Sequence, residues 1–216
     1  MSNFFNLDNP FFQTMSKVFD LILVSVLWVF CCFPVITIGP ATAALYYVVA
    51  KVVRRERGYV YKEFFRAFKE NFITGTVYTI VLVVMAFLFY MNFSFVHMNH
   101  TKTNAFLFYM YWMMLFVIGC ITVYVFPLLS RFHVKPLQLV KMSLFMALKH
   151  LPRTLIMLVF VLITGFTMFI MPPLTMILPG VCALLCSFQL EKVMKLYLPK
   201  PEEGIPKEEL EWYYTF

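Results

Sequence analysis

Charged residues are scarce in this chain. Only 13% of its 216 residues are Asp, Glu, Lys or Arg, whereas 62% are hydrophobic. The hydrophobic residues form long runs separated by short basic loops, a pattern that indicates a membrane protein with several spans. We therefore expect an all-α, polytopic bundle of transmembrane helices, because a helix satisfies its own backbone hydrogen bonds within lipid.

The apolar runs predict about six spans. A helix rises about 1.5 Å per residue, so about 20 residues are needed to cross the hydrocarbon of a bilayer. The third and fourth runs are long enough, and the sequence leaves open whether the second and sixth cross fully. The runs are residues 18–34, 37–53, 72–96, 105–129, 155–171 and 174–188.

The chain divides into a membrane domain, residues 1–198, and a tail, residues 199–216. The tail is rich in proline and glutamate and ends in aromatic residues. This composition disfavours a packed fold and predicts a mobile cytoplasmic segment.

Lysine and arginine are nearly absent from alternate loops. They concentrate in residues 51–69, in residues 131–153 and in the tail, whereas the loop near residue 100 contains only Lys102. Cytoplasmic loops carry an excess of these residues, so both termini are predicted to be cytoplasmic. The net charge of +7 then describes an inner membrane face rather than a nucleic-acid groove.

Motifs for chemistry are also missing. The chain contains no G-x-x-x-x-G-K-S/T loop for ATP and no plausible set of nucleophile, base and acid. Its five cysteines all lie in predicted spans, which gives no disulfide framework. No cluster of three or four strong metal ligands is visible. We therefore expect no enzymatic activity, no metal and no cofactor.

The junction of the first two runs combines proline with small residues. Pro34 ends the first run, and Gly39 and Pro40 suit the cap and first turn of the next helix. Small residues such as Ala43 let a membrane helix approach its neighbour closely. This hairpin is predicted to pack tightly through Pro34, Gly39, Pro40, Ala43, Tyr46 and Tyr47.

An amphipathic helix is predicted within the first basic loop. Its aromatic residues recur at helical spacing and its charged residues occupy the other face. Such a helix either lies in the headgroup region or docks on a partner. The docking hypothesis assigns partner contact to Phe64, Phe65, Phe68, Arg66 and Lys69. A second, less amphipathic helix is expected in residues 131–153, with a stripe of Leu137, Val140, Leu144 and Leu148.

Three segments carry a family resemblance: residues 5–11 (FNLDNPF), 33–47 (FPVITIGPATAALYY) and 61–72. Together they resemble the YesL family of bacterial membrane proteins, over nearly the whole chain. Members are commonly encoded beside carbohydrate importers of the ABC type. The resemblance implies the bacterial cell membrane, an accessory role in oligosaccharide import and permease subunits as partners, and it supplies no catalytic residue.

Two functions therefore remain as hypotheses. The first is an accessory membrane subunit of an ABC-type oligosaccharide importer. The alternative is a small carrier or facilitator for an uncharged solute. No Asp, Glu, Lys or Arg lies at the midpoint of a predicted span, and ion-coupled carriers usually need such a group, so the accessory role is favoured.

Overall fold

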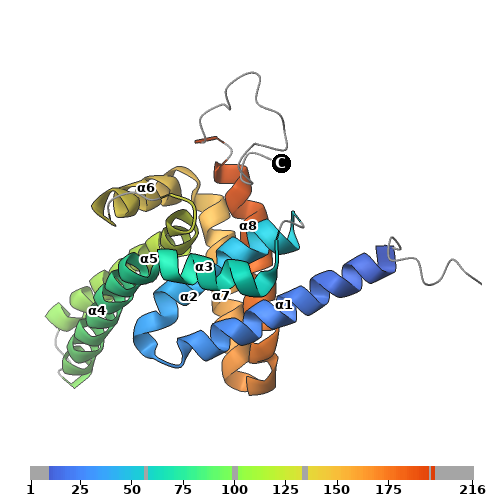
Figure 1. Ribbon diagram of the computed structural model, residues 1–216. Helices are drawn as coiled ribbons and strands as arrows, with labels where there is room; N and C mark the ends of the chain where they lie inside the picture. Colours follow the sequence, from blue (N-terminus) through green and yellow to red (C-terminus); the bar gives the residue numbers. More distant parts are fainter. Residues whose placement is uncertain (1–9, 56–57, 99–101, 133–135, 195, 198–216) are drawn as a thin grey trace, which may run out of the picture.

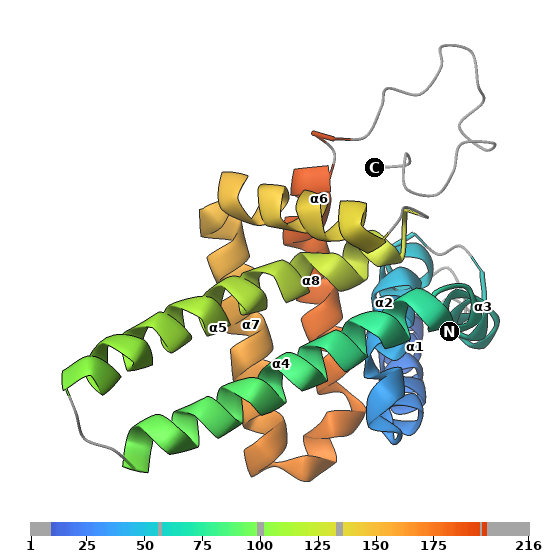
Figure 2. The same cartoon turned by 90° about the vertical axis from the view of Figure 1, so that its left-hand side faces the viewer.

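A computed structural model describes residues 10–55, 58–98, 102–132, 136–194 and 196–197. All regular structure within these residues is helical, as Figures 1 and 2 show. The all-α helical bundle expected from the sequence is therefore confirmed. The proposed tail, residues 199–216, lies outside the described residues.

The chain passes back and forth between two ends of the bundle. In order, the elements are α1 (Pro10–Cys32), η2 (Val35–Thr37), α2 (Ile38–Val48), η3 (Val49–Val53), α3 (Val60–Glu70), α4 (Phe72–Met98), α5 (Lys102–Leu129), α6 (Pro136–Lys149), α7 (Leu151–Ile170), η4 (Pro172–Met176) and α8 (Leu178–Met194). Here η2 and η4 are short 3-10 turns and η3 is a π-helical continuation of α2.

The short helices α3 and α6 lie across one end of the bundle, near the last turns of α2, α5 and α8 (Figures 1 and 2). We call this the basic end, because it carries the arginines that follow η3 and α5. The turns η2 and η4 lie at the opposite end. The two helices predicted within the basic loops therefore lie at the same end of the molecule.

Within the described residues, five helical segments are long and apolar enough to cross a membrane: Thr14–Cys32, Val35–Val53, Phe72–Phe93, Phe108–Leu129 and Leu151–Ile170. The predicted sixth run differs from the structure, because it is divided between η4 and α8. The two prolines at Pro172 and Pro173 lack backbone N–H donors and begin a 3-10 turn instead of a helix. The 17-residue α8 returns beside α7, so a count of six crossings stays a prediction.

The central helix of the bundle is α2. Within the span Val35–Val53, 61% of the residues are buried, against 17% in Phe72–Phe93. This helix contacts α1, α3, α4, α5 and α8. Its small side chains, among them Ala43 and Ala50, are fully buried. They allow several helices to approach one axis.

Two clusters of buried residues share α2. One joins it to α1 and α3 through Val24, Leu45 and Phe64. The other joins it to α4, α5, α6, α7 and α8 and includes Tyr124 and Met157. The helices of the basic end are thus packed into the same cores as the spanning helices.

Candidate functional site

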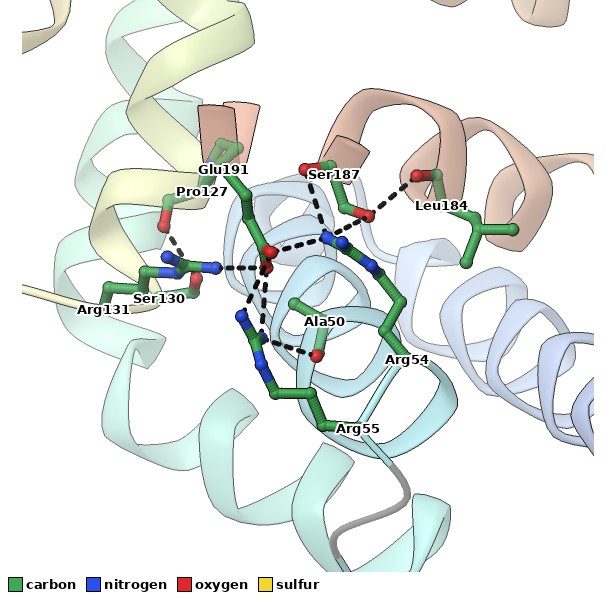
Figure 3. A network of polar contacts seen from close by, with 9 residues as sticks. All are labelled: Ala50, Arg54, Arg55, Pro127, Ser130, Arg131, Leu184, Ser187 and Glu191. Atoms are coloured by element: carbon green, nitrogen blue, oxygen red, sulfur yellow. Dashed lines mark hydrogen bonds and ion pairs between the residues drawn. The ribbon is translucent and has the colours of Figure 1, made fainter. Parts of the chain in front are cut away.

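A single carboxylate, Glu191 on α8, binds three arginines at the basic end (Figure 3). Its Oε2 lies 2.7 Å from Nη1 of Arg54 and 3.0 Å from Nη2 of Arg55. Its Oε1 accepts a hydrogen bond of 2.8 Å from Nη2 of Arg131. The two arginines after η3 and the one after α5 therefore meet on α8.

The network is withdrawn from solvent. The side chains of Arg131 and Glu191 are 1% and 4% exposed. Burial lowers the pKa of the Arg55 guanidinium, and the negative charge of Glu191 opposes that change. Removing charges from water carries a large desolvation cost, so such a network contributes more to fixing one arrangement of helices than to net stability.

Further contacts orient the arginines. Nη1 of Arg55 donates to the carbonyl of Ala50 at 3.0 Å. The Arg54 guanidinium lies 4.4 Å from the ring centroid of Phe188. Its Nη1 also donates to the Ser187 hydroxyl at 3.4 Å (Figure 3). The ends of α2, α5 and α8 are therefore tied together at one point.

Helix α3 is attached directly beside this network. Gly58, with a φ of +94° that favours glycine, turns the chain from η3 towards α3. Nζ of Lys51 then lies 2.8 Å from Oε2 of Glu63 in the first turn of α3. Both side chains are mostly buried, so this pair anchors the start of α3 to the end of α2.

The predicted partner-contact residues fall on two different faces of α3. Phe64 is fully buried in the chain's own core, and Phe65 and Phe68 are half-buried against the same cluster. Arg66 and Lys69 are exposed. The aromatic face thus holds α3 on the bundle, and the charged face is the one that a partner can reach. Partner contact itself stays a prediction.

Two of the predicted packing residues, Gly39 and Pro40, lie where α2 crosses α4. A Cβ added to Gly39 would overlap the carbonyl oxygen of Gly75 and the hydroxyl of Thr79. The N–H of Gly39 donates to that hydroxyl at 2.9 Å. A Cβ added to Gly75 would lie 2.7 Å from the backbone nitrogen of Pro40, so only glycines permit this backbone contact.

The other members of that set differ in burial. Pro40, Ala43 and Tyr46 are buried, and Tyr47 is half-buried. Pro34 is exposed, at the start of η2. The close approach thus begins at Gly39, after the turn, rather than at the proline that ends the first run.

The Glu191 network was missed from the sequence. The sequence places its arginines in basic loops and gives no partner for them. One signal was available: Glu191 is the first acidic residue after Glu70. A lone carboxylate near the end of an apolar run indicates a specific cationic partner, because charge in a membrane helix is costly unless it is paired.

The site consists of the exposed charged face of α3 and the ends of α2, α5 and α8, which Glu191 holds together. In the part of the chain that the structure describes, no group of three or more His, Cys, Asp or Glu side chains is placed to hold a metal ion. The arrangement can present a charged helix in a fixed position at the membrane surface.

Comparison with known families gives one match. Residues 21–93 match the family model described as a protein of unknown function, DUF624. This segment contains most of α1 and α4 and all of α2 and α3. The YesL family is a DUF624-containing family, so the match supports the resemblance over residues 21–93. No curated protein and no solved structure matches the chain.

Proposed function

We propose that the protein is an accessory subunit that binds the permease of an ABC-type oligosaccharide importer in the bacterial cell membrane. The resemblance to YesL proteins supplies the transport context. The excess of lysine and arginine at the basic end supports a cytoplasmic position for that end and for both termini.

The observation that carries this proposal is the fixed position of α3. Its aromatic side is packed into the core, its first turn is anchored by Lys51, and the preceding arginines are bound to Glu191. A surface that is ordered before binding loses less entropy on association. The exposed residues Lys62, Arg66 and Lys69 form such a surface, which suits an acidic segment of a permease.

The packing around α2 favours docking over solute conduction. A carrier for a sugar needs polar groups along its path. Two buried hydroxyls near α2 are instead bound to helix backbone: Thr79 donates to Gly75 at 2.9 Å and Ser25 donates to Leu21 at 2.7 Å. The other buried residues of α2 are apolar except for the hydroxyl of Tyr46, and three of them are alanines.

Charge reversal on α3 tests the proposal. We expect Arg66→Glu with Lys69→Glu to leave membrane insertion and melting unchanged but to reduce co-purification of identified permease subunits and oligosaccharide uptake. Lys192→Glu, an exposed lysine on α8, is the matched control and should change neither.

Two results would oppose the accessory role. One is full permease binding by the α3 double variant. The other is sugar transport into liposomes by the purified protein alone, which would establish the alternative, a small carrier for an uncharged solute.

A further inference from the structure

The second helix of the basic end differs from α3 in charge. Between Glu70 and Glu191 the sequence contains no acidic residue. The charges of α3 are partly paired within the chain, since Lys51 pairs with Glu63 and Arg66 with Glu70. The region of α6 and the start of α7 carries Lys141, Lys149 and Arg153 with no carboxylate of its own.

Helix α6 has two apolar faces. Its inner face is buried and includes Leu139 and Met146. Its outer face exposes Leu137, Leu144 and Leu148, at 69%, 36% and 59%. A helix on the surface of a soluble domain exposes polar residues instead. An outer stripe of leucine flanked by lysine is the pattern of a helix in the membrane interface.

This outer face continues into the lipid-facing surface of a spanning helix. Leu151 and Leu155, in the first turns of α7, are also exposed, at 43% each. Since α7 is a candidate span, the bilayer that surrounds α7 also reaches α6. Lipid is therefore the occupant that the position of this face favours.

Cationic groups gather where α6 meets α7. Nζ of Lys149 lies 5.3 Å from the ring centroid of Tyr197, and the Tyr197 hydroxyl lies 3.4 Å from Nε2 of His150. Nη1 of Arg153 is buried and has no hydrogen-bond partner within the described residues. Burial, together with the charges of Arg153 and Lys149, lowers the pKa of His150. The cluster thus has positive groups and one guanidinium nitrogen that lacks a hydrogen-bond partner in the described part of the chain.

We propose that α6 and the start of α7 bind the phosphate of anionic phospholipids. Lys149 and Arg153 contact the headgroup phosphate, Lys141 attracts neighbouring headgroups, and the leucines of the outer face lie among the upper acyl carbons. Arginine and lysine bind phosphate through charge-assisted hydrogen bonds. This inference does not depend on the proposed function.

The test uses the full-length protein purified in a neutral detergent. Phosphatidylglycerol or phosphatidylcholine of equal chain length is titrated, and the melting temperature and bound lipid are measured. We expect tighter binding of phosphatidylglycerol. Lys149→Gln with Arg153→Gln should weaken that binding about tenfold or more, since one basic residue at an anionic surface contributes roughly fivefold.

The matched control removes two charges from α3, with Lys62→Gln and Lys69→Gln, and should keep the preference. If the first double variant does not fold, Lys141→Gln alone should still weaken phosphatidylglycerol binding about fivefold. Because the pKa of His150 is lowered from its ordinary value of about 6.5, the pH must fall well below that value to charge the ring. That charge should tighten binding in the wild type but not in His150→Gln.

Three outcomes would overturn the proposal. Equal affinity for both lipids would remove the headgroup preference, and an equal loss in the α3 control would show a general charge effect. Displacement of the lipid by millimolar inorganic phosphate or by an acidic peptide would assign the cluster to a soluble phosphate ester or to a protein partner.

Discussion

Glu191 and Arg131 lie 60 positions apart in the sequence, yet their side chains form a buried hydrogen-bonded ion pair of 2.8 Å. The pair joins the end of α5 to α8. The same carboxylate also binds Arg54 and Arg55. Glu191 therefore joins the segment after η3, the end of α5 and α8.

Replacing that carboxylate should be strongly destabilising. Glu191→Gln leaves three arginines without their common anion, and breaking a buried pair by removing one partner costs about 3 to 5 kcal/mol. Thermal melting in detergent measures this change.

The control is Glu70→Gln on α3, which breaks an exposed i,i+4 pair with Arg66. Exposed pairs contribute about 1 kcal/mol or less. If the two variants melted at the same temperature, the Glu191 network would not hold the helices together.

The crossing of α2 and α4 should tolerate no side chain at Gly39. A Cβ there would overlap backbone and hydroxyl oxygens of α4, so Gly39→Ala forces the helices apart and should cost at least about 1 to 3 kcal/mol.

Gly165→Ala is the matched control on α7, where nothing lies within 4 Å of an added Cβ. Alanine is favoured over glycine in a helix by about 1 kcal/mol, so this variant should be neutral or more stable. Equal melting of Gly39→Ala and the wild type would place this face of α2 away from α4.

Topology is predicted from the basic end. In a background without the five native cysteines, Lys62→Cys on α3 should react with a membrane-impermeant maleimide only after the cells are permeabilised. Asn99→Cys, which lies outside the described residues, should react in intact cells. Lys62 is more suitable than Arg55 for this test, because it is exposed. The opposite labelling pattern would show that the predicted orientation in the membrane is wrong.

The spacing of aromatic residues predicted the position of α3 well, but it did not predict what the aromatic face contacts. The aromatic spacing from Tyr61 to Phe72 gave a helix that the structure places at Val60–Glu70. An amphipathic pattern shows only that one face avoids water. It does not distinguish a partner, a lipid surface and the chain's own core, and here the core takes Phe64.

For the last predicted span, the end of the helix differs from the end of the apolar run. Its apolar run ended at Phe188 because Gln189 and Glu191 are polar, whereas α8 continues to Met194. The helix extends because arginines from two distant segments neutralise Glu191. Local hydropathy contains no information on partners so far along the chain. The sequence therefore left open whether the last helix continues past Phe188, and its one signal of the network was the lone Glu191.

The position of Glu191 also sets an order of assembly. Arg55 precedes it by 136 residues and Arg131 by 60, so a ribosome delivers all three arginines before their counter-ion. Until α8 inserts, these arginines lack the carboxylate that binds them in the folded protein. Insertion of α8 is therefore the step that supplies the shared anion to the ends of α2 and α5.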